Sequence, residues 1–475
     1  MKKNSTSNWS SLSTTRKIAI GFFLIILTGT LLLMLPISSA EGKVTNFVDA
    51  LFTAATSVCV TGLVTVTTAT HWSLFGKIVI LILIQLGGLG VICCGIAILM
   101  LFGRKINLKD RIMIQESYGI DEGTYRDVSL SNKKKKVKRN DMLILRILKG
   151  TFIIEGIGAV LFSFRFIPDF GVKKGIWYSV FHSVSAFCNA GLDLIGESSL
   201  MDYRGDLIVN FTTFFLVVTG GIGFIVWWDI IRVIKRARIA KKYKNMLFKR
   251  LSLHSKIAIV TTAVLLVSGA VLFFIFEFNN PDTIGNEPLG NKILISCFQS
   301  MTTRTAGFLT ILQENLTDAS YILTLMLMIV GGSPMGTAGG LKTTTIAMIV
   351  VCVWSVVRGK KDTEIFGRRI SSNNIRTGIA VVSISIMTLV LAIMTLSIVE
   401  PFPLKIIAFE SVSAIATVGL GAGMTAGLTS IGKLIIIFLM YVGRIGPITM
   451  AMAFGAKRSS TLDSIELAEK KIIIG

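Results

Sequence analysis

The sequence predicts an all-α integral membrane protein built from four pseudosymmetric repeats, each a helix, a short re-entrant pore helix, an extended loop and a second helix. Three observations predict this fold class: long apolar runs, few charged residues and a short motif that occurs four times. Of the 475 residues, 52% are hydrophobic and 16% are charged, and the mean hydropathy is +0.71. Soluble proteins contain about 25% charged residues. The composition therefore argues against an ordinary soluble enzyme.

Eight segments are long and apolar enough to cross a bilayer, which takes about 20 helical residues. The first segment follows basic residues and would also suit a signal peptide. We interpret it as a retained helix, because its apolar run is long and no small-residue cleavage site follows it cleanly. The expected spans are 18–37, 75–101, 142–167, 205–234, 255–278, 319–357, 375–399 and 430–456.

Positive charge alternates with these spans. Most of the 49 Lys and Arg residues lie in the N-terminus, 103–149, 232–256, 358–376 and the C-terminal tail. The positive-inside rule assigns these regions, and both termini, to the cytoplasmic side of the cell membrane. The net charge of +22 then reflects topology and not nucleic-acid binding. The basic cluster 133–139 is expected to attract anionic lipids or, alternatively, to dock a cytosolic partner.

Between the two spans of each pair lies a segment that is too short to cross the bilayer and too apolar for an ordinary loop. Each copy starts with Phe and ends in Gly followed by Leu or Phe, and the third copy is one residue shorter. The four glycines are Gly62, Gly191, Gly307 and Gly419. Non-helical backbone at membrane depth must be buried in protein or line a water-filled path. We therefore expect four re-entrant segments around one ion path.

Four extended turns around one axis can present rings of carbonyl oxygens that replace the hydration shell of a cation. Glycine suits such turns because it has no side chain and adopts conformations that other residues avoid. The alternative is that these glycines are helix-packing contacts. That alternative fits Gly87-Gly88 and Gly220-Gly221, which lie inside spans, but it does not explain a fourfold segment.

The repeats divide the chain into six parts. They are repeat 1 over 1–102 with its filter at 58–64, a basic cytoplasmic loop over 103–141, repeat 2 over 142–240 with its filter at 187–193, repeat 3 over 241–360 with its filter at 303–309, repeat 4 over 361–456 with its filter at 415–421, and a cytoplasmic tail over 457–475.

Span 319–357 would be roughly 58 Å long as one helix, far more than a bilayer needs. Its centre, 331–343, contains five glycines and Pro334, which break a helix. A discontinuous helix places backbone groups beside a permeation path. The stretch 336–343 partly resembles a phosphate-binding loop, but Leu341 stands where glycine must precede the lysine. No nucleotide site is expected in this chain.

Two cations are functional candidates because a charge inside a span is costly. Lys342 follows the broken segment, where snorkelling to the interface is the alternative. Arg444 lies in the last span, and we expect it to anchor the broken segment and to repel cations at rest. Arg304 is expected to bond the back of the third filter. Glu155 and Asp229 are candidates for proton coupling, although pairing or an interfacial position is preferred.

Acidic residues cluster in the segments expected outside the membrane. They either raise the local cation concentration at the mouth of the path or form a merely solvated surface. These residues are Asp49, Asp193, Glu197, Asp202 and Glu410.

An enzyme is the disfavoured class. Only three His and six Cys residues are present, without CxxC spacing, so neither zinc nor haem has its ligands. No paired acids and no nucleophile with its base are evident in the spans. No metal beyond the transported ion is expected.

Four such repeats with single-glycine filters resemble the Trk/Ktr/HKT superfamily of potassium transporters over essentially the whole chain. Within that superfamily the sequence is most similar to the KtrB-type membrane subunits of bacterial Ktr uptake systems. The resemblance implies that the K⁺ filter carbonyls belong to Val60, Thr61, Gly62, Asn189, Ala190, Gly191, Thr305, Ala306, Gly307, Thr417, Val418 and Gly419. Gly62, where sodium-transporting plant relatives have Ser, favours potassium.

The resemblance also implies a gate made by the intramembrane loop at 331–343. The expected gating residues are Gly331, Gly332, Ser333, Pro334, Gly336, Gly339, Gly340, Lys342 and Arg444. Further implications are a membrane homodimer and a cytosolic, KtrA-like nucleotide-binding ring of RCK type that controls the gate. K⁺ is then the transported ion, Na⁺ is an optional activator, and the function is K⁺-selective uptake. A Na⁺- or H⁺-coupled K⁺ symporter is the alternative.

Overall fold

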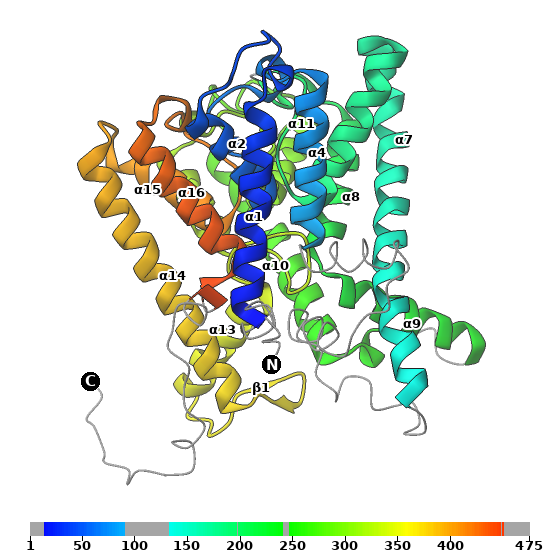
Figure 1. Ribbon diagram of the computed structural model, residues 1–475. Coiled ribbons are helices and arrows are strands. Elements are labelled where there is room, and N and C mark those ends of the chain that lie inside the picture. Colours follow the sequence, from blue (N-terminus) through cyan, green and yellow to red (C-terminus); the bar gives the residue numbers. More distant parts are fainter. Residues whose placement is uncertain (1–13, 91–132, 197, 241–246, 448, 451–475) are drawn as a thin grey trace, which may run out of the picture.

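A computed structural model describes residues 14–90, 133–196, 198–240, 247–447 and 449–450. The described chain is mostly helical (Figure 1). Its two short strands are β1 (Glu364–Ile365) and β2 (Arg368–Arg369), which pair antiparallel in a hairpin that projects from one end of the molecule. The basic loop 103–141 lies largely outside the described residues, as do Glu197 and the tail 457–475.

The helices follow one another in four groups along the chain. The first group comprises α1 (Thr14–Met34), η2 (Pro36–Ser38), α2 (Phe47–Cys59), α3 (Thr68–His71) and α4 (Leu74–Leu89). The second comprises α7 (Lys133–Cys188), η4 (Met201–Tyr203), α8 (Leu207–Gly221) and α9 (Phe224–Ala240). The third comprises η6 (Phe248–Arg250), α10 (Leu253–Glu277), α11 (Leu289–Thr302), η7 (Gln313–Asn315), α12 (Asp318–Ile329) and α13 (Thr343–Val357). The fourth comprises α14 (Ser372–Val399), α15 (Leu404–Ala416), η8 (Thr425–Gly427) and α16 (Ser430–Ile445).

Among the described residues, four helices are long and apolar enough to cross a membrane on their own. They are Thr15–Met34, Arg146–Cys188, Leu253–Glu277 and Ser372–Val399. The element α7 is two helices joined at a kink, because Gly171 has φ +76° and is not helical. Of the other expected spans, 75–101 and 430–456 are described only in part, as α4 and α16.

The expectation of one continuous helix over 205–234 is wrong. Helix α8 ends at Gly221 and α9 starts at Phe224, and the two helices are bent by 95°. The chain turns at Gly223, whose φ of +94° favours glycine. The N–H of Phe224 donates to the carbonyl of Met335 (3.0 Å), so the bend is tied to the chain between α12 and α13.

The run 319–357 forms two helices and not one. Helix α12 ends at Ile329, α13 begins at Thr343, and the chain between them contains no helix. We call residues 331–343 the intramembrane loop. Its two ends are held together, because the N–H of Gly331 donates to the carbonyl of Leu341 (2.8 Å).

In each group the helix that follows the motif glycine starts with a side-chain cap, which satisfies a backbone N–H that would otherwise lack a partner. These helices are α4, α8, α12 and α16. The capping residues are Ser73, Asp206, Thr317 and Thr429. In two groups a buried carboxylate at the end of the preceding long helix completes the cap. Glu277 accepts the N–H of Thr317 (3.0 Å), and Glu400 accepts the N–H of Thr429 (3.1 Å).

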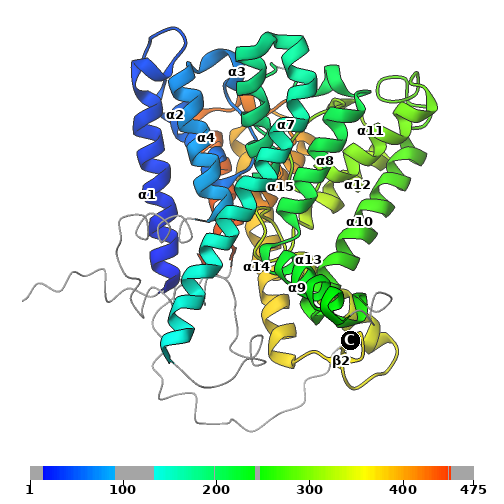
Figure 2. The same ribbon diagram turned by 90° about the vertical axis from the view of Figure 1, so that its right-hand side faces the viewer.

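The four groups pack in a closed order. Helix α4 contacts α7, α8 contacts α11, α12 contacts α15, and α16 returns to α2. The short helices α2 and α15 lie inside this arrangement, each against two longer helices of its own group, whereas α11 packs against α10 of its own group and α8 of the preceding one (Figures 1 and 2). The centre of the bundle is therefore lined by segments from all four groups.

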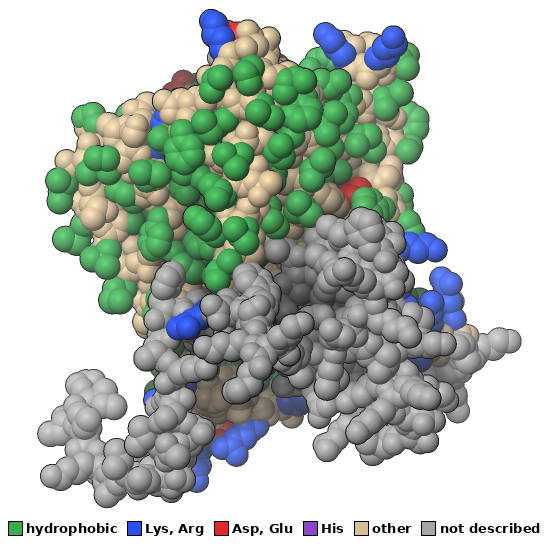
Figure 3. All heavy atoms as spheres, viewed as in Figure 1, with side chains coloured by type: hydrophobic (Ala, Val, Ile, Leu, Met, Phe, Trp, Pro, Cys, Tyr) green, Lys and Arg blue, Asp and Glu red, His purple; other side chains and the backbone are tan. Residues whose placement is uncertain are grey.

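Large hydrophobic side chains cover the outside of the bundle. Ile398 is 84% exposed and Val357 is 73% exposed, and many similar side chains surround them. Figure 3 shows hydrophobic side chains spread over the upper and middle part of one face, with Lys and Arg at its margins. Apolar surface on this scale marks an interaction with membrane or protein, and here it encircles helices of bilayer length.

Candidate functional site

Each of the four motif copies ends in the same unusual backbone conformation. We call the three residues that end at each motif glycine the turn of that copy. The residue two positions before the motif glycine is left-handed, with φ of +57° at Val60, +61° at Asn189, +64° at Thr305 and +51° at Thr417. The glycines that follow also have positive φ. For β-branched Val and Thr this conformation is strained. Such strain persists only where the surrounding structure imposes it, often at functional sites.

One backbone hydrogen bond recurs in all four copies. The N–H of the residue before the glycine donates to the carbonyl of the residue four positions after the motif Phe. The pairs are Thr61 to Thr56 (2.9 Å), Ala190 to Ser185 (2.8 Å), Ala306 to Thr302 (3.0 Å) and Val418 to Ser413 (2.8 Å). The third copy keeps this bond although it is one residue shorter, because its turn is one residue tighter.

The same four positions carry a hydroxyl that also binds the extended backbone. The hydroxyl of Thr56 accepts the N–H of Gly62 (3.0 Å), and that of Ser413 accepts the N–H of Gly419 (3.1 Å). The hydroxyls of Ser185 and Thr302 donate to the carbonyls of Leu192 and Phe308, both at 2.6 Å. Sequence analysis missed this ring, although a Ser or Thr stands four residues after each motif Phe.

The four glycines approach one another in a closed cycle. A Cβ added to Gly62 would lie 2.7 Å from the Ala190 carbonyl oxygen, one added to Gly191 2.7 Å from that of Ala306, and one added to Gly307 2.8 Å from that of Val418. A Cβ on Gly419 would collide with the carbonyl of Thr61, which closes the cycle. Each turn therefore faces the carbonyl just before the glycine of the next turn.

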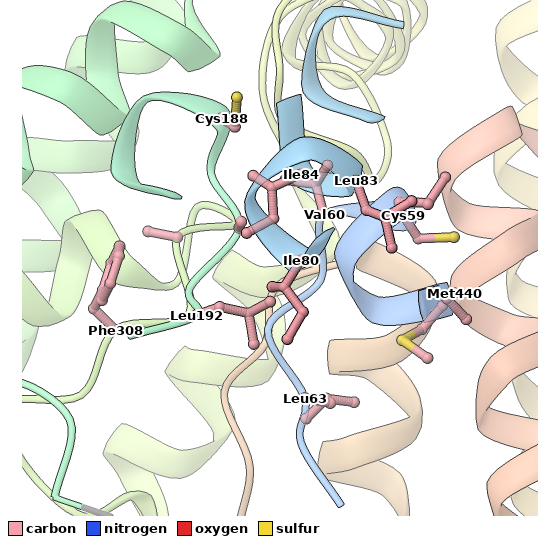
Figure 4. Close-up of a cluster of buried hydrophobic side chains, with 14 of the residues drawn as sticks. Cys59, Val60, Leu63, Ile80, Leu83, Ile84, Cys188, Leu192, Phe308 and Met440 are labelled. Carbon is pink, nitrogen blue, oxygen red and sulfur yellow. The ribbon is translucent and has the colours of Figure 1, made fainter. Parts of the chain in front are cut away.

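Buried side chains hold the turns from behind. Figure 4 shows Ile80, Leu83 and Ile84 of α4 beside Val60, the left-handed residue of the first turn. The motif phenylalanines, which start this packing in each copy, are at most 2% exposed. They are Phe52, Phe181, Phe298 and Phe409. Such dense packing keeps the turns in their strained conformation.

A second glycine pattern lies in the helices that follow the turns. The sequence reads Gly-Gly-Leu-Gly at 87–90, Gly-Gly-Ile-Gly at 220–223 and Gly-Arg-Ile-Gly at 443–446. A Cβ on Gly87, Gly220 or Gly443 would collide with the carbonyl of the residue four positions before the motif glycine. Helix packing, the expected role of the glycine pairs in α4 and α8, is therefore one function of this pattern.

In this pattern Arg444 replaces a glycine. Its guanidinium donates to the carbonyl of Thr337 in the intramembrane loop, and to those of Gly87 (2.5 Å) and Gly88 (3.3 Å) in α4. The side chain therefore joins the loop to two different groups of helices, as the expected anchoring role requires. Comparing the glycine patterns would have singled out Arg444 more sharply than its charge alone.

Lys342, near the end of the loop, makes hydrogen bonds within it. Its Nζ donates to the carbonyls of Ala338 (2.8 Å) and Gly339 (3.4 Å), and its side chain is half-buried. Among the described contacts these bonds favour a role in shaping the loop over snorkelling to the interface.

The intramembrane loop touches three of the four turns. The Thr337 hydroxyl donates to the side-chain oxygen of Asn189 (2.9 Å), and Gly339 is so close to Thr417 that a Cβ there would collide with its hydroxyl. Arg304 donates to the carbonyl of Gly331 (2.9 Å). The expected bond from Arg304 to the back of the filter is therefore corrected: its guanidinium reaches the loop instead.

The acidic residues expected at the outer mouth do not act as one exposed set. Glu410 is fully buried, and its carboxylate accepts the N–H groups of Ala422 (3.2 Å) and Met424 (2.7 Å). It holds the chain after the fourth turn and does not face solvent, so its assignment to the mouth is wrong. Asp49 is neutralised by Lys433 (2.7 Å).

The two acids considered for proton coupling both have partners. The Asp229 carboxylate is 5% exposed and pairs with Arg232, as the preferred interpretation requires. Glu155 is also 5% exposed and accepts an amide hydrogen bond from Gln85 (3.0 Å). Within the described ranges, no group of three or more His, Cys, Asp or Glu residues could hold a metal ion.

Comparison with known proteins decides the family. The sequence model of the TrkH family, described as "Cation transport protein", matches residues 6–462. The chain belongs to the TrkH family. This membership confirms the resemblance to the Trk and Ktr transporters, and it identifies the protein as a member of a transporter family and not as an enzyme.

Relatives of this TrkH-family chain match it over its whole length. It is 40% identical to the "Potassium/sodium uptake protein NtpJ" of Enterococcus hirae over 468 residues, 98% of each chain. It is 38% identical to the "Ktr system potassium uptake protein B" of Bacillus subtilis over 466 residues, 97% of each chain. The fold is similar to the crystal structure of the potassium transporter TrkH from Vibrio parahaemolyticus, with a TM-score of 0.67 at 15% identity. That match covers 95% of this chain and 86% of the other.

Proposed function

We propose that this TrkH-family protein takes up K⁺ across the cell membrane through one filter made by its four turns. The closed cycle of glycine-to-carbonyl approaches carries this proposal. A ring of backbone carbonyls from four segments is the arrangement that can replace the hydration shell of a dehydrated cation. The uptake of potassium named for relatives at 38–40% identity supports K⁺ as the ion.

In this proposal the filter carbonyls come from the three residues that end at each glycine. The left-handed residue at the start of each triplet turns the backbone so that successive carbonyls point toward the axis. The ring of hydroxyls behind the turns keeps that geometry by binding the glycine N–H or the carbonyl after it. Four similar triplets give similar carbonyls on all sides of the ion.

The intramembrane loop is the proposed gate. Its hydrogen bonds with Asn189 and Arg304 and the close approach of Gly339 to Thr417 put it against three turns, and Arg444 holds it from α16. A loop held by a few polar contacts is easier to displace than a packed helix. The Arg444 guanidinium, which bonds the loop from α16, adds positive charge that opposes cation passage at rest. Displacement of the loop would open the path.

The protein is further proposed to work as a membrane homodimer with a cytosolic, KtrA-like ring of RCK type that controls the loop. The relatives named as Ktr system proteins support a multi-component system. Nucleotide would then act through the ring, and Na⁺ would act at most as an activator. Both termini are assigned to the cytoplasm on the charge distribution.

A Na⁺- or H⁺-coupled K⁺ symporter is the second candidate. The name of the Enterococcus hirae relative includes sodium, and Glu155 is a buried carboxylate with a neutral partner that could carry a proton. Both candidates share the filter and differ in whether another gradient drives K⁺.

Flux measurements on purified protein in liposomes test both candidates. We expect K⁺ flux down an imposed K⁺ gradient that ignores Na⁺ and H⁺ gradients and rises when the cytosolic ring is added. Gly419→Ala should reduce K⁺ flux by at least about tenfold, since the new methyl collides with the Thr61 carbonyl. Gly156→Ala, where a Cβ meets open space, is the matched control and should keep full flux.

Two outcomes would contradict the proposal in different ways. K⁺ accumulation that occurs only with an inward Na⁺ or H⁺ gradient would establish the symporter. Equal flux in Gly419→Ala and Gly156→Ala, with both proteins folded, would mean that the glycine cycle is not the ion path.

A further inference from the structure

Helix α9 leaves the bundle at a steep angle and carries its charges on one side. It is bent by 95° from α8. It runs across the lower end of the molecule in Figure 1 and is seen nearly end-on in Figure 2. Val233 and Ala237 are buried, whereas Arg232, Lys235 and Arg236 are exposed. An amphipathic helix at a right angle to the spans is typical of the membrane surface.

Beside this helix lies a pocket with three arginines. Its volume is about 190 Å³, and its lining consists of Arg232, Val233, Arg236 and Arg250. Two of the arginines stand one turn apart on α9, and Arg250 ends the short helix η6 just before α10. Three arginines from two separate elements therefore line one hollow.

A buried carboxylate holds the two elements together. Asp229 accepts a hydrogen bond from the Arg232 guanidinium with one oxygen and from the Ser252 N–H (2.8 Å) with the other. Ser252 lies two residues after Arg250, so this contact fixes α9 against the segment that supplies the third arginine. The single carboxylate of Asp229 carries less charge than Arg232 and Arg236 together, so the α9 side of the pocket keeps a net positive charge.

We propose that this pocket binds a phosphoryl group, supplied by the headgroup of an anionic phospholipid. Guanidinium groups bind phosphate oxygens in paired hydrogen bonds, and several arginines around one pocket are a common means of phosphate recognition. The pocket volume accommodates a phosphate with part of its glycerol. Neither the filter nor the intramembrane loop includes any of these arginines, so the site is independent of the ion path.

Neighbouring aromatic side chains favour a lipid over free phosphate. Phe248 is 43% exposed and Phe366 is 50% exposed, their rings are 6.1 Å apart, and the ammonium group of Lys256 lies 5.9 Å from the first. Exposed Phe side chains beside basic residues are typical of segments that lie in the membrane interface. A lipid whose phosphate sits among the arginines would find apolar surface beside its chains.

The test is lipid retention by the full-length protein. We would reconstitute it in nanodiscs of phosphatidylcholine with some phosphatidylglycerol and count the phosphatidylglycerol that remains bound in native mass spectrometry. The double variant Arg232→Gln with Arg236→Gln should lower retention about tenfold or more. Lys235→Gln with Arg238→Gln removes the same charge from the same helix outside the pocket, and should leave retention nearly unchanged.

A second variant and a second probe keep the outcomes distinct. Arg250→Gln, on the other element, should also lower retention, which guards against a local folding defect in α9. Titration of the detergent-purified protein with inorganic phosphate separates the two sources of the ligand. Phosphate binding that depends on the same arginines, without selective lipid retention, would support the site but assign it to a soluble phosphate compound.

Two results would overturn the site. The first is an equal loss of lipid in the pocket variant and in the charge-matched control, because charge alone would then explain binding. The second is lipid and phosphate binding that is unchanged in the pocket variants. This includes the result that the variants lose binding of a cytosolic protein but still bind lipid and phosphate like wild type.

Discussion

At the scale of single residues, four hydroxyls at the same motif position each bind the backbone of their own turn or the residue just after it. Thr56 and Ser413 bind the N–H of the motif glycine, and Ser185 and Thr302 bind the carbonyl after it. A buried hydrogen bond contributes about 1 kcal/mol to stability, and leaving its backbone partner unpaired costs about 1–3 kcal/mol. Such a loss at one turn would disturb one quarter of the proposed carbonyl ring.

Ser413→Ala is therefore expected to weaken ion selection more than folding. The N–H of Gly419 loses its acceptor, so the fourth turn becomes freer to move. We expect the K⁺/Na⁺ flux ratio in liposomes to fall about fivefold, in keeping with a change of about 1 kcal/mol.

Ser397→Ala is the control, because that hydroxyl bonds only within α14 and faces outward. If the K⁺/Na⁺ flux ratio stays at the wild-type value in both variants, the hydroxyl ring does not determine ion selectivity.

Arg444 is the second residue whose role can be isolated. Its guanidinium bonds three carbonyls that belong to the loop and to α4, and the removal of this partly buried, hydrogen-bonded charge leaves those carbonyls unpaired. Arg444→Gln should raise the resting K⁺ leak of liposomes without the ring and lower the thermal unfolding temperature in detergent. If resting leak and maximal flux both match wild type, Arg444 does not hold the gate.

At the scale of elements, the intramembrane loop is connected to the turns by side chains of the turns themselves. Asn189 is the clearest link: its side-chain oxygen accepts from Thr337, and its amide group lies 3.5 Å from the Arg304 carbonyl. The side-chain amide of this second-turn residue therefore contacts both the third turn and the loop. We expect movement of the loop to shift the second and third turns of the proposed filter through this contact.

Thr337→Val tests that coupling with little change in shape. The hydroxyl that donates to Asn189 and to the Phe187 carbonyl (3.0 Å) is lost. We expect a higher resting K⁺ flux and a smaller increase when the cytosolic ring is added. Thr395→Val, whose hydroxyl bonds only within α14, should behave as wild type. An unchanged response to the ring in Thr337→Val would mean that loop and filter are coupled elsewhere.

At the scale of the whole molecule, the closed packing order of the four groups shows how one chain could surround the proposed ion path. Each group supplies one turn, and neighbouring groups meet through α4 and α7, α8 and α11, α12 and α15, and α16 and α2. The hydrophobic outer surface of this ring is what a bilayer requires, since lipid offers no hydrogen-bond partners.

The orientation of this ring in the membrane is testable by labelling. The charge distribution assigns Asp202 to the outside and Lys360 to the cytoplasm, and both side chains are exposed. Asp202→Cys should react with a membrane-impermeant maleimide in intact cells, whereas Lys360→Cys should react only after permeabilisation, once the labelling of the native cysteines is subtracted. The opposite pattern would invert the assigned topology and with it the side of the gate.

Much of this protein could be predicted from its sequence alone, because its repeats are local patterns. The apolar runs, the four Phe-to-Gly motifs and the glycines of 331–343 each depend on residues close together in the chain. Bilayer length and helix-breaking chemistry act on such neighbours directly. Membership in a transporter family followed from the same patterns.

Only the tertiary structure decided which distant groups meet. It placed Glu410 in the interior, turned Arg304 toward Gly331, bent the chain between α8 and α9, and brought Arg250 beside Arg232 and Arg236. These outcomes depend on how helices from different repeats pack, and packing is set by the shapes of surfaces far apart in the sequence. The sequence alone determined the four Phe-to-Gly motifs, the break in the helix at 331–343 and the charged candidates. The folded chain determined which backbone groups those candidates bind, because a buried charge must bond the polar groups that packing brings within reach.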